Sequence, residues 1–164
     1  MLLFGHALQS MITIEPPHPI AASSDPALSK AGLARFLNRA AALVGLHGEV
    51  HVLLADDATL KRLNRTFSGK NKATDVLSFP AAAEGGDAGV AGDLAISLET
   101  AARQAKQFGH TLRDEVRVLL LHGTLHLAGF DHEADAGEMA AREAELRKAL
   151  RLPTSLIARV TTKH

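Results

Sequence analysis

Three histidines and Gly129, all within residues 122–132, constrain the fold more than any other feature of the sequence. His122 and His126 are four residues apart, which places two side chains on one helix face with Cβ atoms about 5–6 Å apart. Gly129 follows three residues later, at a position suited to the left-handed conformation that ends many helices. We therefore expect a helix through His122 and His126, and a turn that brings His132 back toward them.

Three imidazoles that converge in this way are typical ligands of a catalytic divalent ion. Because catalytic zinc commonly has three protein ligands and an open position, we predict one zinc ion per chain on His122, His126 and His132. Two histidines four residues apart are a weak indication alone, since a single histidine beside an apolar helix face is commonly a hydrogen-bonded core residue. The added glycine and third histidine match the spacing of the metzincin signature. Metzincins have a general-base Glu after the first histidine, where this chain has Gly123, so their protein-cleaving machinery is not shared.

The residues around this motif predict a site with little water and one supporting carboxylate. Apolar side chains precede and interleave the histidines, namely Val116, Leu119, Leu120, Leu125 and Leu127. Such a surround strengthens electrostatic interactions at an ion. Asp131 is a candidate for a carboxylate that hydrogen-bonds a ligand histidine, and a solvated turn residue is the equally open alternative.

A basic segment at residues 61–72 is the second informative feature. The chain has 18 basic and 18 acidic residues, so it must meet a polyanion with a local patch and not with its net charge. This segment has five basic residues and no acidic one: Lys61, Arg62, Arg65, Lys70 and Lys72. The pattern suits phosphate contacts, although a solvated helix face with a polar loop would have the same composition.

Hydrophobic periodicity predicts one domain with strands and helices in mixed order. At about 150 residues per domain, the 164 residues correspond to a single domain. The expected strands are 11–14, 49–54, 75–79 and 94–97, and the expected helices are 29–44, 58–66, 99–108, 112–128 and 134–150. A basic loop is expected at 67–73 and a flexible stretch at 81–91. Because strands and helices do not alternate strictly, the class is α+β or an open mixed α/β sheet.

The ends of the chain and its composition suggest a cytoplasmic protein. We expect a flexible extension at 1–10, with Met1 or Met11 as initiator, a domain over 11–153, and a tail at 154–164. The sequence has no cysteine, which excludes disulfides and thiolate chemistry. No apolar run approaches the roughly 20 residues that span a bilayer, and the first residues lack the features of a signal peptide. We therefore expect no membrane association.

Three segments together resemble the YbeY family, the bacterial metal-dependent endoribonucleases of ribosomal RNA maturation. They are residues 122–132 (HGTLHLAGFDH), 74–80 (TDVLSFP) and 92–97 (GDLAIS). The resemblance implies a single α+β domain, with a small mixed four-stranded sheet covered by about five helices and a zinc-type ion on the three histidines. It also implies action on single-stranded RNA in 16S rRNA 3′-end maturation and ribosome quality control. The implied partners are rRNA and the ribosome or small-subunit assembly components.

One position departs from the family pattern. The family usually has a functionally important arginine directly before the glycine of the basic loop, and this chain has Ser68 before Gly69. We expect Arg65 or Lys70 to supply this catalytic charge instead, and Lys72 to help steady the phosphate. A weaker nuclease is the alternative outcome of the exchange.

Two other functions remain open from the sequence. One is a metallohydrolase of another substrate, including peptides, and the other is a non-catalytic ribosome-assembly factor with a structural metal. A closed site with four protein ligands would favour the structural role. The sequence offers three ligands, which favours catalysis.

Overall fold

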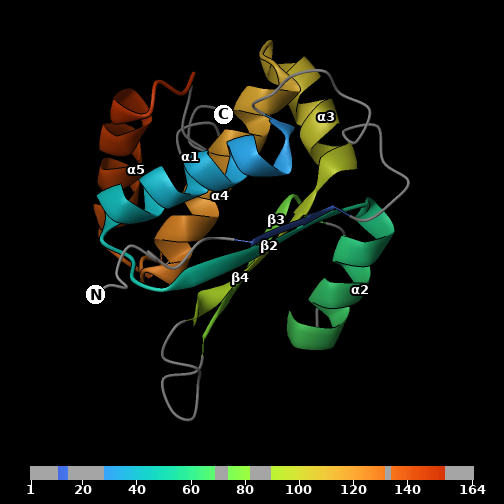
Figure 1. The fold of residues 1–164 in the computed structure, drawn as a ribbon, viewed down its shortest axis with the longest axis horizontal. Coiled ribbons are helices and arrows are strands. Elements are labelled where there is room, and N and C mark those ends of the chain that lie inside the picture. Colours follow the sequence, from blue (N-terminus) through green and yellow to red (C-terminus); the bar gives the residue numbers. More distant parts are fainter. Residues whose placement is uncertain (1–10, 15–27, 69–73, 82–89, 132–133, 154–164) are drawn as a thin grey trace.

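The computed structural model describes residues 11–14, 28–68, 74–81, 90–131 and 134–153, and these residues form one sheet with helices on both faces (Figure 1). In these ranges there are four strands and five helices, in agreement with the predicted α+β class. Their order is β1 (Met11–Ile14), α1 (Lys30–Val44), β2 (Glu49–Ala55), α2 (Asp57–Ser68), β3 (Val76–Pro80), β4 (Val90–Ser97), α3 (Leu98–Phe108), α4 (Leu112–Leu127) and α5 (Glu138–Ala149). No described helix has the length and apolar character needed to cross a membrane. The predicted extension at 1–10 and tail at 154–164 lie outside the described residues.

The sheet is mixed, with strand order β1-β2-β4-β3. β1 and β4 both run parallel to β2, whereas β3 runs antiparallel to β4 and forms an edge of the sheet. The edge position explains how β3 can end on a proline, because Pro80 has no N–H to donate to a further strand. β3 therefore has one side free of strand neighbours among the described residues, next to the helices that pack on it.

Local signals explain where several helices begin and end. Ser29 begins α1 by accepting a hydrogen bond at Oγ from the backbone N–H of Gly32 at 3.0 Å. Gly45 ends the same helix with a φ of 83°, a left-handed conformation that glycine adopts without strain. Gly129 has a φ of 101°, as predicted for the turn after α4.

Several predicted boundaries differ from the observed ones by one to four residues. α2 continues to Ser68, so its last turn includes the start of the predicted basic loop. β4 begins at Val90, not 94, because its pairing with β2 extends as far as Glu49 and Val90. β3 correspondingly includes Pro80, where the prediction ended it at residue 79. α5 begins at Glu138, not 134, because Gly137 has a φ of 106° and interrupts the helical conformation.

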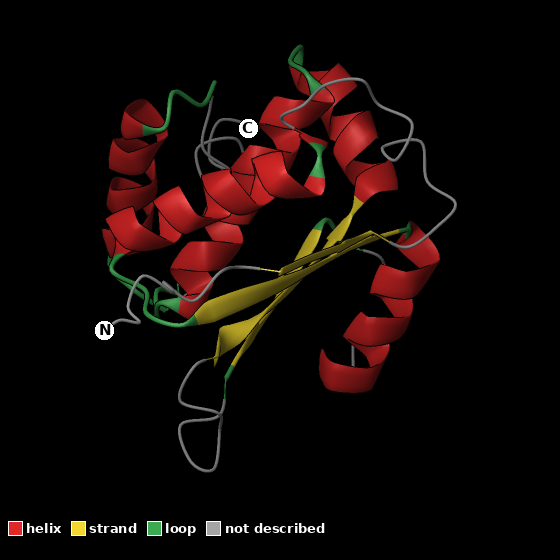
Figure 2. Cartoon of the chain, in the orientation of Figure 1, coloured by secondary structure: helices red, strands yellow, loops and turns green. Residues whose placement is uncertain are grey.

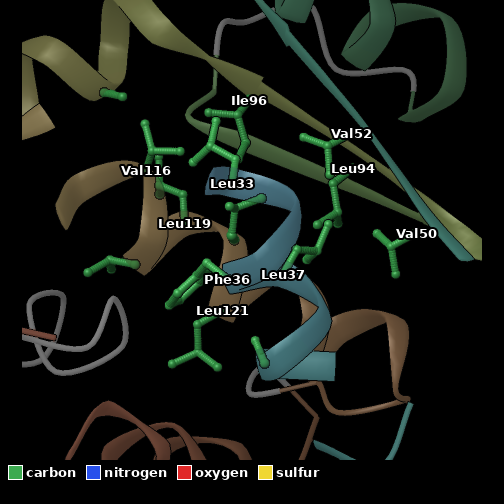
Figure 3. Close-up of a cluster of buried hydrophobic side chains, with 14 of the residues drawn as sticks. Leu33, Phe36, Leu37, Val50, Val52, Leu94, Ile96, Val116, Leu119 and Leu121 are labelled. Atoms are coloured by element: carbon green, nitrogen blue, oxygen red, sulfur yellow. The ribbon is translucent and has the colours of Figure 1, made fainter. Parts of the chain in front are cut away.

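The main core lies between one face of the sheet and the helices α1, α3, α4 and α5 (Figure 2). Side chains of α1 and α4 pack there against side chains of β2 and β4 (Figure 3). The helices contribute Leu33, Phe36, Leu37, Val116, Leu119 and Leu121, and the strands contribute Val50, Val52, Leu94 and Ile96. The opposite face is covered by α2, over a much smaller cluster that contains Ala55, Leu60 and Ala95. The two faces of the sheet therefore differ strongly in how much apolar surface they bury.

Candidate metal centre

The two described histidines of the predicted ligand set face each other on α4. The Nε2 atoms of His122 and His126 are 3.2 Å apart, and the two rings meet edge to face at an angle of 75°. His122 is 5% exposed, whereas His126 is half-buried. His122 thus lies in the main core, whereas His126 is partly exposed. The helix predicted from the four-residue spacing is confirmed, and the two side chains converge on one face of it, while their role as metal ligands stays a prediction.

The separation of these two nitrogens fits a shared zinc ion. Two nitrogens that each lie about 2.0–2.1 Å from a tetrahedral zinc are roughly 3.4 Å from one another. The observed 3.2 Å between the Nε2 atoms of His122 and His126 is close to this value. The third predicted ligand, His132, lies outside the described residues, and within the described ranges no group of three ligating side chains forms.

A buried glutamate on α5 contacts the site and was not predicted. The carboxylate of Glu143 lies 2.7 Å from His122, between Oε2 and Nδ1, and Glu143 is 1% exposed. The sequence does contain a signal for it. On α5 the buried residues Met139 and Leu146 form an apolar stripe, and Glu143 is the charged residue at the same helical spacing. A charge at a core position of a helix indicates a buried partner.

Gly123 lies where metzincins have their general base, and the structure explains why this position has no side chain. A Cβ atom built on Gly123 would lie 2.7 Å from Cδ2 of Leu94 in β4. Leu94 is 1% exposed, so its side chain has little room to move aside. The glycine therefore allows α4 to pack directly against the sheet. The absence of a glutamate at this position follows from helix–sheet packing.

Asp131 lies in the turn after α4 and is exposed. Its backbone carbonyl accepts hydrogen bonds from the N–H groups of Ala134 and Asp135, at 3.1 and 3.0 Å. Its side chain remains a prediction as a supporting carboxylate for a ligand histidine. The carboxylate that the structure places against His122 is that of Glu143.

The described part of the basic segment lies on the other face of the sheet. Lys61, Arg62 and Arg65 are exposed on α2, which covers the face opposite α4 (Figure 1). Lys70 and Lys72 lie outside the described residues. The structure therefore does not bring Arg65 beside the histidine pair, and the predicted phosphate contacts remain a prediction.

The edge strand β3 connects the two faces. Ser78 directs its Oγ toward α4, 3.5 Å from the carbonyl of Gly123. The next residue, Phe79, points to the opposite face and packs edge to face on Phe67 of α2, with ring centroids 5.3 Å apart. α2 and α4 thus contact adjacent residues of one edge strand from opposite faces.

An open cavity of about 400 Å³ lies on the α2 face. Phe67 is 66% exposed at its rim, and His51 and Asp93 approach to 3.6 Å between Nδ1 and Oδ1. The lining residues come from all four strands and α2: Thr13, His51, Val52, Leu53, Leu63, Phe67, Phe79, Asp93, Leu94 and Ala95. An exposed aromatic ring next to exposed cations was not predicted from the sequence.

The start of α2 is held to α3 by a carboxylate with a lowered pKa. Burial alone would raise the pKa of Asp57, but hydrogen bonds from Ser97, Thr100 and Arg103 outweigh this effect and hold it below its usual value. The pKa of Asp56 is also lowered, chiefly by the backbone N–H of Thr59, which donates to Oδ1 at 2.9 Å. Asp56 is therefore the residue that caps α2.

Comparisons with known proteins agree with this arrangement. The sequence matches the family described as Endoribonuclease YbeY over residues 24–151. An endoribonuclease YbeY from Koribacter versatilis is 52% identical over 134 residues, covering 82% of this chain and 86% of that protein. Another, from Nautilia profundicola, is 51% identical over 111 residues, covering 68% and 78%. The solution structure of TM1509 from Thermotoga maritima has a TM-score of 0.56 and 27% identity, covering 85% of this chain and 89% of that one. The chain therefore belongs to the endoribonuclease YbeY family.

Proposed function

We propose that this chain is a metal-dependent endoribonuclease that cleaves single-stranded RNA and holds a zinc-type ion on His122, His126 and His132. Two observations support this proposal. The Nε2 atoms of His122 and His126 face each other at 3.2 Å, and the chain belongs to an endoribonuclease family. The resemblance to the YbeY family implies that this activity serves 16S rRNA 3′-end maturation and ribosome quality control. The chain would then act in the cytoplasm on rRNA, with ribosome or small-subunit assembly components as partners.

The side chains around the histidines have clear tasks in this function. His122 and His126 present nitrogen donors from one helix face, and His132 is the third donor of the proposed set. When bound, the ion supplies Lewis-acid activation of water and stabilisation of charge on a phosphoryl oxygen. The apolar residues Leu119 and Leu125 are fully buried on the same helix and exclude water from the inner side of the site. Polar interactions there are stronger than in bulk water.

The substrate path in this proposal runs around the β3 edge. Arg65 and Lys70 carry charge for the phosphate, and Lys61, Arg62 and Lys72 add contacts along the backbone. Arg65 is exposed on the α2 face and the histidines lie on the α4 face, so in this proposal one RNA strand crosses the edge to contact both. A flexible single strand can follow such a path, whereas a stiff duplex cannot bend around one strand of a sheet. This geometry favours single-stranded RNA.

Cleavage of single-stranded RNA by the purified protein tests the function. We expect cleavage that a chelator abolishes, that added zinc restores, and that His126→Ala lacks. His47→Ala is the matched control, because His47 is exposed in the loop after α1, and it should retain activity. Zinc-dependent peptide cleavage without RNA cleavage would replace this function by that of another metallohydrolase. A bound ion with neither activity would indicate a structural metal.

A further inference from the structure

Two buried histidine–carboxylate pairs involve α4, and they lie at different distances from the proposed site. His122 pairs with Glu143 of α5, with 2.7 Å between Nδ1 and Oε2. His110 pairs with Glu115, with 2.6 Å between Nε2 and Oε1, at the junction of α3 and α4. Glu115 precedes His122 by seven residues on α4, which is about 10 Å along the helix axis. Each pair joins an imidazole nitrogen to a carboxylate oxygen, but only the first pair includes a proposed metal ligand.

We propose that Glu143 is a positioning residue of the metal centre, which fixes the tautomer and ring orientation of His122. Its carboxylate accepts a hydrogen bond from Nδ1–H of His122. A neutral imidazole carries one N–H, so a proton held on Nδ1 makes Nε2 the nitrogen that bears the lone pair. That Nε2 is the atom that faces His126 at 3.2 Å. The inference rests on the proposed function for the identity of the ion, but the tautomer belongs to the chain itself.

Because both partners are buried, this contact selects between the two neutral tautomers of His122. The side chains of His122 and Glu143 are 7% and 1% exposed, so water cannot readily replace either partner. A buried carboxylate needs hydrogen-bond donors, because it loses much of its hydration. Nδ1–H is such a donor, whereas an unprotonated Nδ1 would present a lone pair to the carboxylate oxygen at 2.7 Å. The contact therefore strongly favours one of the two neutral tautomers of His122.

The helix that carries Glu143 is fixed in place by its own packing. Met139 and Leu146 flank Glu143 on α5 and are 0% and 2% exposed in the main core. Asp135 holds the start of the helix by accepting a hydrogen bond from the N–H of Met139 at 2.9 Å. A carboxylate on such a rigid element holds its partner ring more narrowly than one on a loop.

The variant Glu143→Gln tests the proposal, with Glu115→Gln as the matched control. Glutamine has the same shape, but its amide can accept from Nδ1–H or donate to a bare Nδ1, so it does not select a tautomer. The first readout is the tautomer of His122, measured by ¹⁵N NMR on metal-free protein in mildly alkaline buffer. We expect the Nδ1–H form in wild type and Glu115→Gln, and a mixture of both forms in Glu143→Gln.

The second readout is zinc affinity, measured by competition with a chromophoric chelator. We expect Glu143→Gln to bind zinc roughly 10- to 100-fold more weakly than wild type. Glu115→Gln should bind zinc as wild type does, even though both variants lose a buried charged hydrogen bond and melt at a lower temperature. A merely structural role of Glu143 would lower the melting temperature and leave zinc affinity unchanged.

The outcomes separate this inference from the proposed function. If NMR shows that wild-type His122 carries its proton on Nε2, Glu143 does not set the tautomer. The wild-type measurement alone would then show that the inference is wrong. It is equally wrong if Glu143→Gln and Glu115→Gln have the same zinc affinity. If wild type has the Nδ1–H form but binds no zinc, the metal-dependent function fails while the tautomer assignment stands.

Discussion

The two faces of the sheet differ in how much surface they bury and in the charged groups they carry. On the α4 face, α1, α3 and α4 pack on the sheet and α5 packs on α4, and this face contains nearly all the large, fully buried side chains. The α2 face has one helix, a small apolar cluster, an open cavity of about 400 Å³ and an exposed Phe67. The histidine pair and Glu143 lie on the first face, and the exposed cations of α2 lie on the second.

In the proposed function, this difference would separate a rigid ion site on one face from adaptable RNA contacts on the other. An ion site needs donor atoms held within a few tenths of an ångström, and the packed core around α4 provides this precision. The proposed phosphate contacts of Lys61 and Arg65 would depend on long, exposed side chains and would tolerate small movements. Substitutions should therefore affect stability strongly on one face and RNA binding on the other.

The largest stability contrast is expected between matched leucines on the two faces. Leu119→Ala on α4 removes a fully buried side chain and should lower the free energy of unfolding by about 2–5 kcal/mol. Leu63→Ala on α2 shortens a half-buried side chain beside the open cavity and should cost about 1 kcal/mol. Urea unfolding of both variants measures the difference. Equal losses would contradict the assignment of the main core to the α4 face.

Filling the space at Gly123 should also destabilise the α4 face, by about 1–3 kcal/mol. Gly123→Ala places a methyl group 2.7 Å from Cδ2 of Leu94, and this strain exceeds the helix-forming advantage of alanine. Leu94→Ala provides the control, because it removes the atom that clashes. In urea unfolding, the double variant should lose about 1 kcal/mol less than the sum of the two single variants. Strictly additive losses would show that the two positions do not touch.

Neutralising the exposed cations of α2 should flatten the salt dependence of RNA binding. Replacing Lys61, Arg62 and Arg65 by glutamine should reduce the slope of log affinity against log salt by about 2, since each phosphate contact on a single strand contributes about 0.7. The matched control replaces three exposed lysines on other helices, Lys30, Lys106 and Lys148. Fluorescence anisotropy with a labelled single strand measures both slopes. A reduction of the same size in the control would mean that only total charge matters.

The smallest effect is expected at Asp57, where α2 is tied to α3. Asp57→Asn weakens the hydrogen bonds from Ser97, Thr100 and Arg103. It should lower the free energy of unfolding at pH 7 by about 1 kcal/mol. The expected loss is small because water partly screens the exposed side of the carboxylate. The pKa of Asp57 is lowered by folding, so its stabilisation is complete above the unfolded-state value of about 3.9. It is lost as the pH falls through the lower folded-state pKa. Urea unfolding should therefore show the gap between wild type and Asp57→Asn narrowing toward pH 3, whereas a constant gap would refute this origin.

Sequence reasoning succeeded where the determining interactions are local. The four-residue spacing of His122 and His126 and the left-handed Gly129 depend on a single helix and its end, so they could be predicted. Glu143 is 21 residues from His122, and nothing in local periodicity says which buried group its carboxylate meets. The position of α2 on the opposite face from α4 depends likewise on how the strands are ordered in the sheet. The basic segment could therefore be identified from the sequence, whereas its position relative to the histidines could not, because that position depends on the strand order.

Parallel titration of bound metal and RNA cleavage tests the central claim most directly. Samples of the purified protein are depleted of metal in steps with a chelator, and each sample is assayed for metal content and for cleavage of a single-stranded RNA. We expect about one divalent ion per chain in the loaded protein, cleavage that falls in proportion to bound ion, and recovery when zinc is returned. His126→Ala should show neither the ion nor the cleavage. Undiminished cleavage by metal-free protein, or no bound metal even after zinc is supplied, would contradict the account.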